Sequence, residues 1–270
     1  MTLAAIKESQ SSKAIILGSG VTVLEGKEPI ASIPYADIPG WPLGKVKGHK
    51  GVLDIYDDIW VLRGRAHLYE GFSWQQACFP TQFLVDNGIK ELIVTNSAGG
   101  INPDYQVGDL MQITGYLDFI RPGKERGNLE ALTQKIIPVS TSEILFEKLS
   151  DARLAKIGQA ELTEPSMMTA ESECNAADGT LRMRSGVYVA VHGPNYESDA
   201  EVALFRKLGA DAVGMSTAPE LEVAITNSLK ITAISVITNV YGKTEDLGHE
   251  GVLAAAKQAS EKLTKLLRIN

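Results

Sequence analysis

The stretch ELIVTNSAGG, residues 91–100, decides the fold class of this chain. It opens with an apolar, β-branched run and closes with small and polar residues. A short continuous apolar run of this kind is typical of a strand that is covered on both faces of a sheet. Similar runs that end in Gly, Ser, Thr or Asn recur at 13–20, 186–197, 210–220 and 231–242. The repetition predicts a sheet built from buried strands.

Helical spacing of apolar residues is found between and after these runs. The predicted helices cover residues 73–90, 199–209, 216–230 and 249–269, and Pro80 is expected to kink the first. Strands that alternate with helices predict an α/β fold. The chain shows no linker, repeat or low-complexity tract, so we expect residues 1–270 to form a single domain. The polar region from about 121 to 180 gives no clear pattern.

Composition narrows the class of protein. Hydrophobic residues make up 44% of the chain and charged residues 22%, as in ordinary globular proteins, and the formal net charge is −7. No basic cluster stands out, which argues against nucleic acid as a partner. No apolar run approaches the roughly 20 residues that a membrane span needs. The N-terminus lacks the apolar core of a signal peptide and the chain has only two cysteines, so we expect a cytoplasmic protein.

The segment GRAHLYEG, residues 64–71, predicts an anion site. It follows the apolar-biased run DIWVLRG, which is read as a strand. If the chain stays extended, Arg65, His67 and Tyr69 point to the same side, because alternate residues of a strand share a face. Arginine offers a planar fork of donors and histidine adds another. The alternative for Arg65 is a surface ion pair with Glu70 or a nearby aspartate.

Small polar residues follow several of the predicted strands. In α/β sheets, ligands collect outside the carboxyl ends of strands, so these residues are candidate ligand contacts. The loop Gly18-Ser19-Gly20 would let the backbone approach an anion closely, although such a loop is also an ordinary tight turn. The candidates at strand ends are Ser19, Asn96, Ser97, Ser216, Thr238 and Asn239.

Glu197 and Asn239 match the polar edge of a 6-oxopurine. A carboxylate accepts hydrogen bonds, whereas a carboxamide both donates and accepts. The carboxylate would take the N1–H of the base, and the amide would face N7 or O6. The alternative for Glu197 is an acidic residue in the first turn of a helix, where the macrodipole favours it.

The histidines argue against a metal site. They stand at positions 49, 67, 192 and 249, without the spacing of metal ligands and without a cysteine cluster. The G-x-S-x-G motif of serine hydrolases is also missing from the sequence.

Taken together, the motifs resemble the trimeric class of purine nucleoside phosphorylases. The resemblance covers roughly residues 13–120 and 186–265, and its motifs are ILGSG, VKGHKG, GRAHLYEG, VTNSAGGINPDYQVGDLM, GPNYES, LGADAVGMSTAPE, VITN and GHEGVLAAAKQA. It implies a single-domain α/β fold with a central mixed β-sheet flanked by helices, and a homotrimer. It also implies a reaction in which a purine nucleoside and phosphate give the free purine and ribose 1-phosphate. Phosphate would be a co-substrate in this reaction, and no cofactor would be needed.

The resemblance also implies roles for individual residues. Phosphate would contact Ser19, His49, Arg65, His67, Ser97 and Ser216. The sugar would contact Tyr69, Met215 and His249. The base would contact Tyr196, Glu197, Thr238 and Asn239. The residues implied in catalysis are Asn239, Glu197 and His67.

The chain departs from the family pattern at two places. It reads Gly-Tyr-Leu-Asp at 115–118, where the family has an Asp-His-Ile-Asn element. In residues 121–140 we do not recognise the segment that, in the family, lends a phenylalanine to the neighbouring subunit. The alternatives are therefore a nucleoside phosphorylase of the methylthioadenosine or xanthosine type, and a purine-binding relative without catalytic activity.

Overall fold

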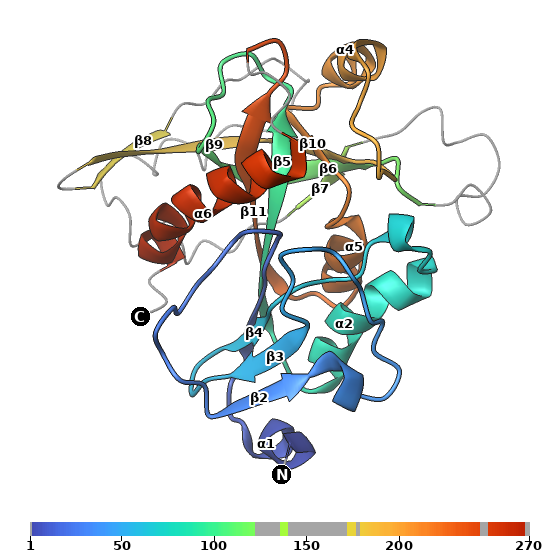
Figure 1. Cartoon of the computed structure of the whole chain (residues 1–270), viewed down its shortest axis with the longest axis vertical. Helices are drawn as coiled ribbons and strands as arrows, with labels where there is room; N and C mark the ends of the chain where they lie inside the picture. Colours follow the sequence, from blue (N-terminus) through green and yellow to red (C-terminus); the bar gives the residue numbers. More distant parts are fainter. Residues whose placement is uncertain (1, 122–135, 140–171, 177–178, 244–247, 268–270) are drawn as a thin grey trace.

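The computed structural model describes residues 2–121, 136–139, 172–176, 179–243 and 248–267 (Figure 1). Its centre is an eleven-stranded mixed sheet. The strands are β1 (Lys13–Ile16), β2 (Ala31–Pro34), β3 (Val52–Ile55), β4 (Trp60–Leu62), β5 (Glu91–Gly100), β6 (Leu110–Asp118), β7 (Ile137–Pro138), β8 (Ser172–Ala176), β9 (Gly179–Ala190), β10 (Ala212–Gly214) and β11 (Lys230–Val240).

Helices flank this sheet, as the sequence predicts. The α-helices are α1 (Thr2–Glu8), α2 (Trp74–Asp86), α4 (Asp199–Lys207), α5 (Ala218–Thr226) and α6 (Gly248–Leu267), and the short 3₁₀ helices are η1 (Tyr35–Asp37) and η2 (Leu68–Glu70). Within the described residues, no helix is both long and apolar enough to cross a membrane.

The stretch at residues 91–100 forms β5, which lies between β1 and β11 and runs parallel to both. The strand order is β10-β9-β6-β11-β5-β1-β4-β3-β2, with β7 on β6 and β8 on β9. The end of β5 also pairs with β10, because Gly99 and Gly100 lie opposite Val213 and Ala212. The pairings therefore close a ring through β5, β11, β6, β9 and β10.

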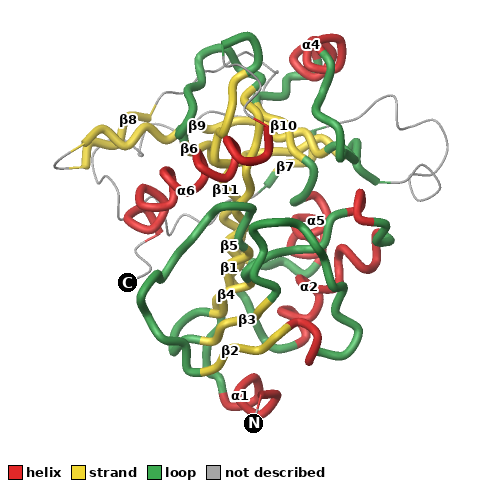
Figure 2. The backbone as a smooth tube through the Cα atoms, in the orientation of Figure 1, coloured by secondary structure: helices red, strands yellow, loops and turns green. Residues whose placement is uncertain are grey.

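Both faces of the central strands β1 and β5 are buried, as their apolar runs predict. Ile16 on β1 and Val94 on β5 belong to a core shared with α2 and α5, whereas their neighbours Ile15 and Ile93 belong to a second core shared with α6. This alternation is the ordinary two-residue period of a strand. The tube drawing shows α2 and α5 side by side, with α6 apart from them (Figure 2).

Several element boundaries differ from the prediction. The first predicted helix begins at Trp74, where Ser73 and Gln76 form a capping box, and it continues through Pro80 to Asp86. The run at 210–220 gives only the three residues of β10, because α5 begins at Ala218. The strands β2, β3 and β6 were not predicted from the sequence. Most of the unclear region from 121 to 180 lies outside the described residues.

Candidate active site

A pocket lies where several strands end. It is bordered by the ends of β5, β10 and β11 and by the segments after β1, β4 and β9, and it encloses about 680 Å³, including solvent at its mouth. Eleven of the predicted site residues line it: Ser19, Arg65, His67, Tyr69, Ser97, Tyr196, Glu197, Met215, Ser216, Thr238 and Asn239.

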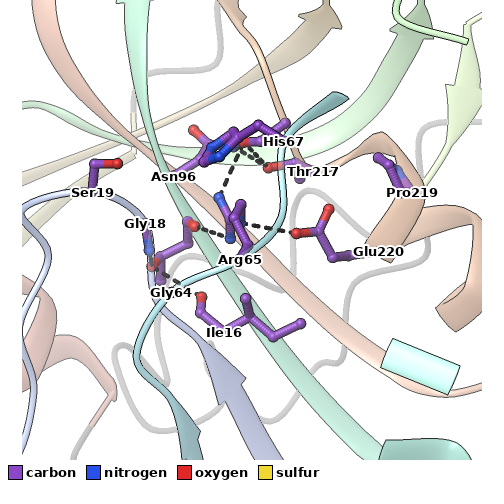
Figure 3. A network of polar contacts seen from close by, with 12 residues as sticks. Ile16, Gly18, Ser19, Gly64, Arg65, His67, Asn96, Thr217, Pro219 and Glu220 are labelled. Carbon is purple, nitrogen blue, oxygen red and sulfur yellow. Dashed lines mark hydrogen bonds and ion pairs between the residues drawn. The ribbon is translucent and has the colours of Figure 1, made fainter. Parts of the chain in front are cut away.

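Arg65 is buried and makes several polar contacts. Its Nη1 donates to Ser216 Oγ over 3.0 Å, and its Nη2 donates to the Thr95 carbonyl over 2.6 Å. Its Nε lies 2.9 Å from Glu220 Oε1, as an ion pair without hydrogen-bond alignment (Figure 3). The alternative of a surface ion pair with Glu70 or an aspartate is therefore wrong, because the guanidinium is buried and its carboxylate partner is Glu220.

Glu220 is a site residue that the sequence analysis missed. It lies in the first turn of α5 and is only 3% exposed. Its carboxylate points at Arg65 (Figure 3). The partners stand 155 positions apart, and no local pattern connects them. The carboxylate balances the guanidinium charge, so an anion in the pocket meets a paired arginine.

The backbone before α5 is strained. Thr217 is fully buried and has φ 75° and ψ −37°, which is unfavourable for a β-branched residue. The Ala218 N–H donates to the Ser216 carbonyl over 2.9 Å, so the turn has the γ form. Asn96 Nδ2 donates to Thr217 Oγ1 over 2.9 Å. Asn96 therefore supports this turn, which sets the positions of Ser216 and Glu220.

The chain after β4 does not stay extended to Tyr69, contrary to the prediction. The His67 backbone N–H donates to Glu70 Oε2 over 3.0 Å at the start of η2, and Gly71 ends this helix in the left-handed region. The His67 ring still stacks on Tyr69, with centroids 4.8 Å apart. It also stacks on His49, with centroids 5.3 Å apart. Tyr69 thus reaches the pocket through ring stacking.

Burial keeps the two stacked histidines neutral. It lowers the pKa of His67 and lowers the pKa of His49 to about 3. His67 Nδ1 lies 3.3 Å from Glu70 Oε2, which favours the Nδ1–H tautomer and leaves Nε2 as an acceptor. The positive charge among the residues that line this pocket therefore comes from Arg65.

His49 lies behind the pocket wall. The Arg65 backbone N–H donates to His49 Nδ1 over 3.3 Å, so the neutral ring carries its proton on Nε2. His49 Nε2 lies 3.2 Å from Ser19 Oγ. Ser19 accepts this bond, and its own hydroxyl hydrogen is left for a ligand. Gly64 permits the arrangement, because a Cβ there would lie 2.7 Å from the His49 Cβ. His49 was predicted to contact phosphate. In the structure it contacts Ser19, which lines the pocket, and is not itself a lining residue.

The remaining predicted anion ligands flank Arg65. Ser97 Oγ donates to the Ser19 carbonyl over 2.8 Å and lines the pocket from β5. Ser216 Oγ accepts from Arg65 and lies 3.1 Å from Thr217 Oγ1. Ser19, Ser97 and Ser216 thus line the same pocket as the Arg65 guanidinium. The role of each group toward phosphate stays a prediction.

Glu197 lies across the pocket, between β9 and α4. It precedes Ser198, the N-cap of α4, so the alternative of a first-turn acid is wrong; that turn contains Asp199 and Glu201. Tyr241 donates its phenol hydrogen to Glu197 Oε2. Glu197 Oε1 is buried without a hydrogen-bond partner among the described residues. Burial raises the pKa of Glu197.

A bulge in β11 places Asn239 in the pocket. Ile237 pairs with Ala98 and Asn239 pairs with Gly99, so Thr238 is an extra residue on its strand. A bulge of this kind re-aims the following side chain. Thr238 Oγ1 donates to the Ala98 carbonyl over 3.3 Å, which holds the bulge in place. Asn239 therefore lies on the same wall as Glu197 and Tyr241.

Three more predicted residues stand at the mouth or sides of the pocket. Tyr196 is 49% exposed at its edge, and Tyr69 and Met215 line its side. His249 belongs to α6, but its side chain lies outside the described part of the chain. Val252 on the same helix lines the pocket. The sequence analysis also missed Tyr241, although it follows Asn239 by two positions and alternate strand residues share a face.

In the described ranges, no group of three or more His, Cys, Asp or Glu side chains is placed to hold a metal ion. Among the described residues, the polar side-chain groups of this pocket are hydroxyls, one guanidinium, one imidazole, one carboxylate and one carboxamide.

Comparisons with known proteins agree with this geometry. Residues 12–269 match the family model described as the phosphorylase superfamily. The chain is 34% identical to purine nucleoside phosphorylase 1 of Geobacillus stearothermophilus, over 94% of this chain and 88% of that protein. It is 35% identical to the purine nucleoside phosphorylase of Bos taurus, over 97% and 89%.

A solved structure extends the likeness to the fold. Isoform 2 of purine nucleoside phosphorylase from Schistosoma mansoni, in complex with cytosine and ribose-1-phosphate, superimposes with a TM-score of 0.70 at 27% identity. The superposition covers 98% of this chain and 91% of that one. Because these matches span nearly the whole sequence, the chain belongs to the phosphorylase superfamily and, within it, to the purine nucleoside phosphorylases.

Proposed function

We propose that this enzyme catalyses the phosphorolysis of 6-oxopurine nucleosides, such as inosine and guanosine, to the free base and the pentose 1-phosphate. The supporting observation is that one pocket brings the donors around Arg65 together with Glu197 and Asn239. The first group suits an oxyanion and the second suits a purine edge. The relatives named above, one of them bound to ribose-1-phosphate, support the same reaction.

In this proposal phosphate lies against Arg65, Ser19 and Ser216, and one of its oxygens attacks C1′ of the nucleoside. A bond forms between that oxygen and C1′, while the bond from C1′ to N9 breaks and its electron pair moves to the purine. The purine anion then takes up a proton, and the phosphate ester gives up its own. The sugar carries positive charge in a transition state like that of glycoside cleavage. The phosphate dianion stabilises that charge. His67 Nε2 would accept a hydrogen bond from the protonated oxygen of the phosphate.

The leaving base carries the negative charge. The Asn239 amide would donate to N7 or O6 as that charge develops, which stabilises the transition state more than the bound nucleoside. Glu197 would accept from N1–H and fix the orientation of the base. Tyr69, Met215 and His249 would contact the sugar, and Tyr196 would pack on the base. His49 would act on phosphate through Ser19.

The direct test is an assay with inosine. We expect hypoxanthine release that requires added phosphate and yields ribose 1-phosphate in equal amount. Release without phosphate would indicate hydrolysis, and no release at any phosphate concentration would indicate a purine-binding relative. Running adenosine, xanthosine and methylthioadenosine in parallel tests the alternatives among nucleoside phosphorylases. A strong preference for any of these over inosine would contradict the proposal.

A substitution of Glu197 tests base recognition separately. We expect Glu197→Ala to lower kcat/KM for inosine and guanosine by about 10- to 100-fold, the value of one hydrogen bond to a charged group. Adenosine presents an acceptor at N1, so its rate, however low, should fall much less. The measurement is kcat/KM for the three nucleosides at saturating phosphate.

Glu201→Ala is the matched control, because Glu201 caps the adjacent helix and is exposed. It should leave the ranking of the three nucleosides unchanged. Equal losses for all three nucleosides in Glu197→Ala would contradict the assigned role of the carboxylate.

The resemblance to the trimeric class supports a homotrimer of the 29.1 kDa chain. We propose that the protein is a homotrimer in solution. A measurement of its molar mass in solution tests this, and we expect three times the mass of the chain. The cytoplasmic location and the single domain also stay predictions.

A further inference from the structure

The carboxylate of Glu197 has one occupied and one open oxygen. Tyr241 donates to Oε2, whereas Oε1 is buried and has no partner among the described residues. Both side chains line the pocket. One oxygen of this pocket-lining carboxylate is therefore engaged by Tyr241, and the other has hydrogen-bonding capacity that no described residue uses.

The position of Tyr241 is fixed by its surroundings. Its backbone N–H donates to the Gly100 carbonyl over 3.0 Å, which continues the pairing of β11 with β5. Its ring lies over Gly99, because a Cβ at that position would lie 2.9 Å from Tyr241 Cε2. Only glycine leaves this space, so the ring of Tyr241 is held beside Glu197 by the backbone of β5.

The bases that fit this pocket differ along the edge that faces Glu197. Hypoxanthine presents a single N–H there, at N1. Guanine presents N1–H and, next to it, an amino group at C2. A carboxylate with two open oxygens accepts such a pair of parallel donors well, as it does from the fork of arginine. A carboxylate with one open oxygen accepts only the first.

We infer that Tyr241 is a specificity-determining residue that selects bases with one N–H donor on this edge, such as hypoxanthine, over bases with an added 2-amino group. The inference rests on the proposed function and names the preferred base within it. The phenol oxygen keeps lone pairs of its own, but it is a neutral acceptor. Hydrogen bonds to ionised acceptors are about twice as strong as those to neutral ones. Guanine therefore binds less tightly when its 2-amino group meets the phenol oxygen of Tyr241 than when it meets a free oxygen of Glu197.

The test is Tyr241→Phe, which removes the phenol oxygen and keeps the ring over Gly99. We expect the ratio of kcat/KM for guanosine to that for inosine to rise about tenfold, because the freed Oε2 gives the amino group a charged partner. The same shift should appear in the dissociation constants of guanine and hypoxanthine, measured by calorimetry with phosphate present. If the variant turns over too slowly for kinetics, the ratio of the dissociation constants of guanine and hypoxanthine tests the inference.

Tyr105→Phe is the matched control. Its hydroxyl donates to the Ser185 carbonyl over 3.2 Å, away from the pocket, and its removal should leave the ratio unchanged. A ratio that stays constant in Tyr241→Phe would overturn the inference. A ratio that falls would also overturn it, because the phenol oxygen would then be the acceptor for the amino group. If the wild-type chain does not phosphorolyse inosine, the proposed function itself fails, which is a different result.

Discussion

We expect Asn239→Ala to lower kcat for inosine by about 10²–10³-fold, the usual cost of removing one donor aimed at developing charge. The carboxamide reaches the pocket because Thr238 forms the bulge in β11, and this bulge is a backbone feature that alanine at 239 leaves in place. The loss should therefore appear in kcat more than in the apparent affinity for phosphate. Steady-state rates at saturating phosphate measure it.

Asn87→Ala is the control for this substitution. Asn87 is exposed at the end of α2, where its amide donates to the Phe83 carbonyl, and it does not line the pocket. Its replacement should change kcat by no more than about twofold, as for most surface sites. A change of less than about threefold in Asn239→Ala would remove Asn239 from the catalytic step.

The second large effect concerns stability. We expect Glu220→Ala to lower the free energy of unfolding by about 3–5 kcal/mol, because it leaves the buried guanidinium of Arg65 without its carboxylate. Urea unfolding in a buffer without phosphate measures the loss. Phosphate offers a replacement anion, so adding it should stabilise Glu220→Ala more than it stabilises the wild-type chain.

A second buried ion pair provides the comparison. Arg184 and Asp109 lie 3.4 Å apart, away from the pocket, and both side chains are buried. Asp109→Ala should also lower stability, but phosphate should stabilise it only as much as the wild-type chain. If phosphate stabilises both variants equally, Arg65 is not the group that binds it. If Glu220→Ala unfolds like the wild-type chain, the ion pair contributes little.

Much of the fold follows from local patterns. The run that opens the segment 91–100 is apolar because β5 is buried between two parallel neighbours, and the sequence predicts this strand. The structure extends it through the small and polar residues 96–100, which were expected to follow the strand. The strand β6 was missed, since its polar and small residues interrupt the apolar run. The strands β2 and β3 are four residues long and carry exposed or polar side chains, which makes their pattern weak.

The site was predictable where chemistry is concentrated in a short segment. Arg65, His67 and Tyr69 stand within a few positions of one another, and unusual residues that close together are informative. Glu220 was not predictable, because its partnership with Arg65 depends on the γ-turn at Thr217 that starts α5. The neutral state of His67 depends on burial, which is a property of the folded chain.

The place of β5 in the sheet has a consequence for biosynthesis. Its two parallel neighbours come from opposite parts of the chain, since Lys13 and Lys230 both lie opposite Glu91. Pairings between such distant segments form late and slowly. When a ribosome has synthesised the first two hundred residues, Arg65, Ser19 and Ser97 are present in the nascent chain, but Ser216 and Asn239 are not. We therefore expect catalytic activity only from chains whose synthesis has continued past β11.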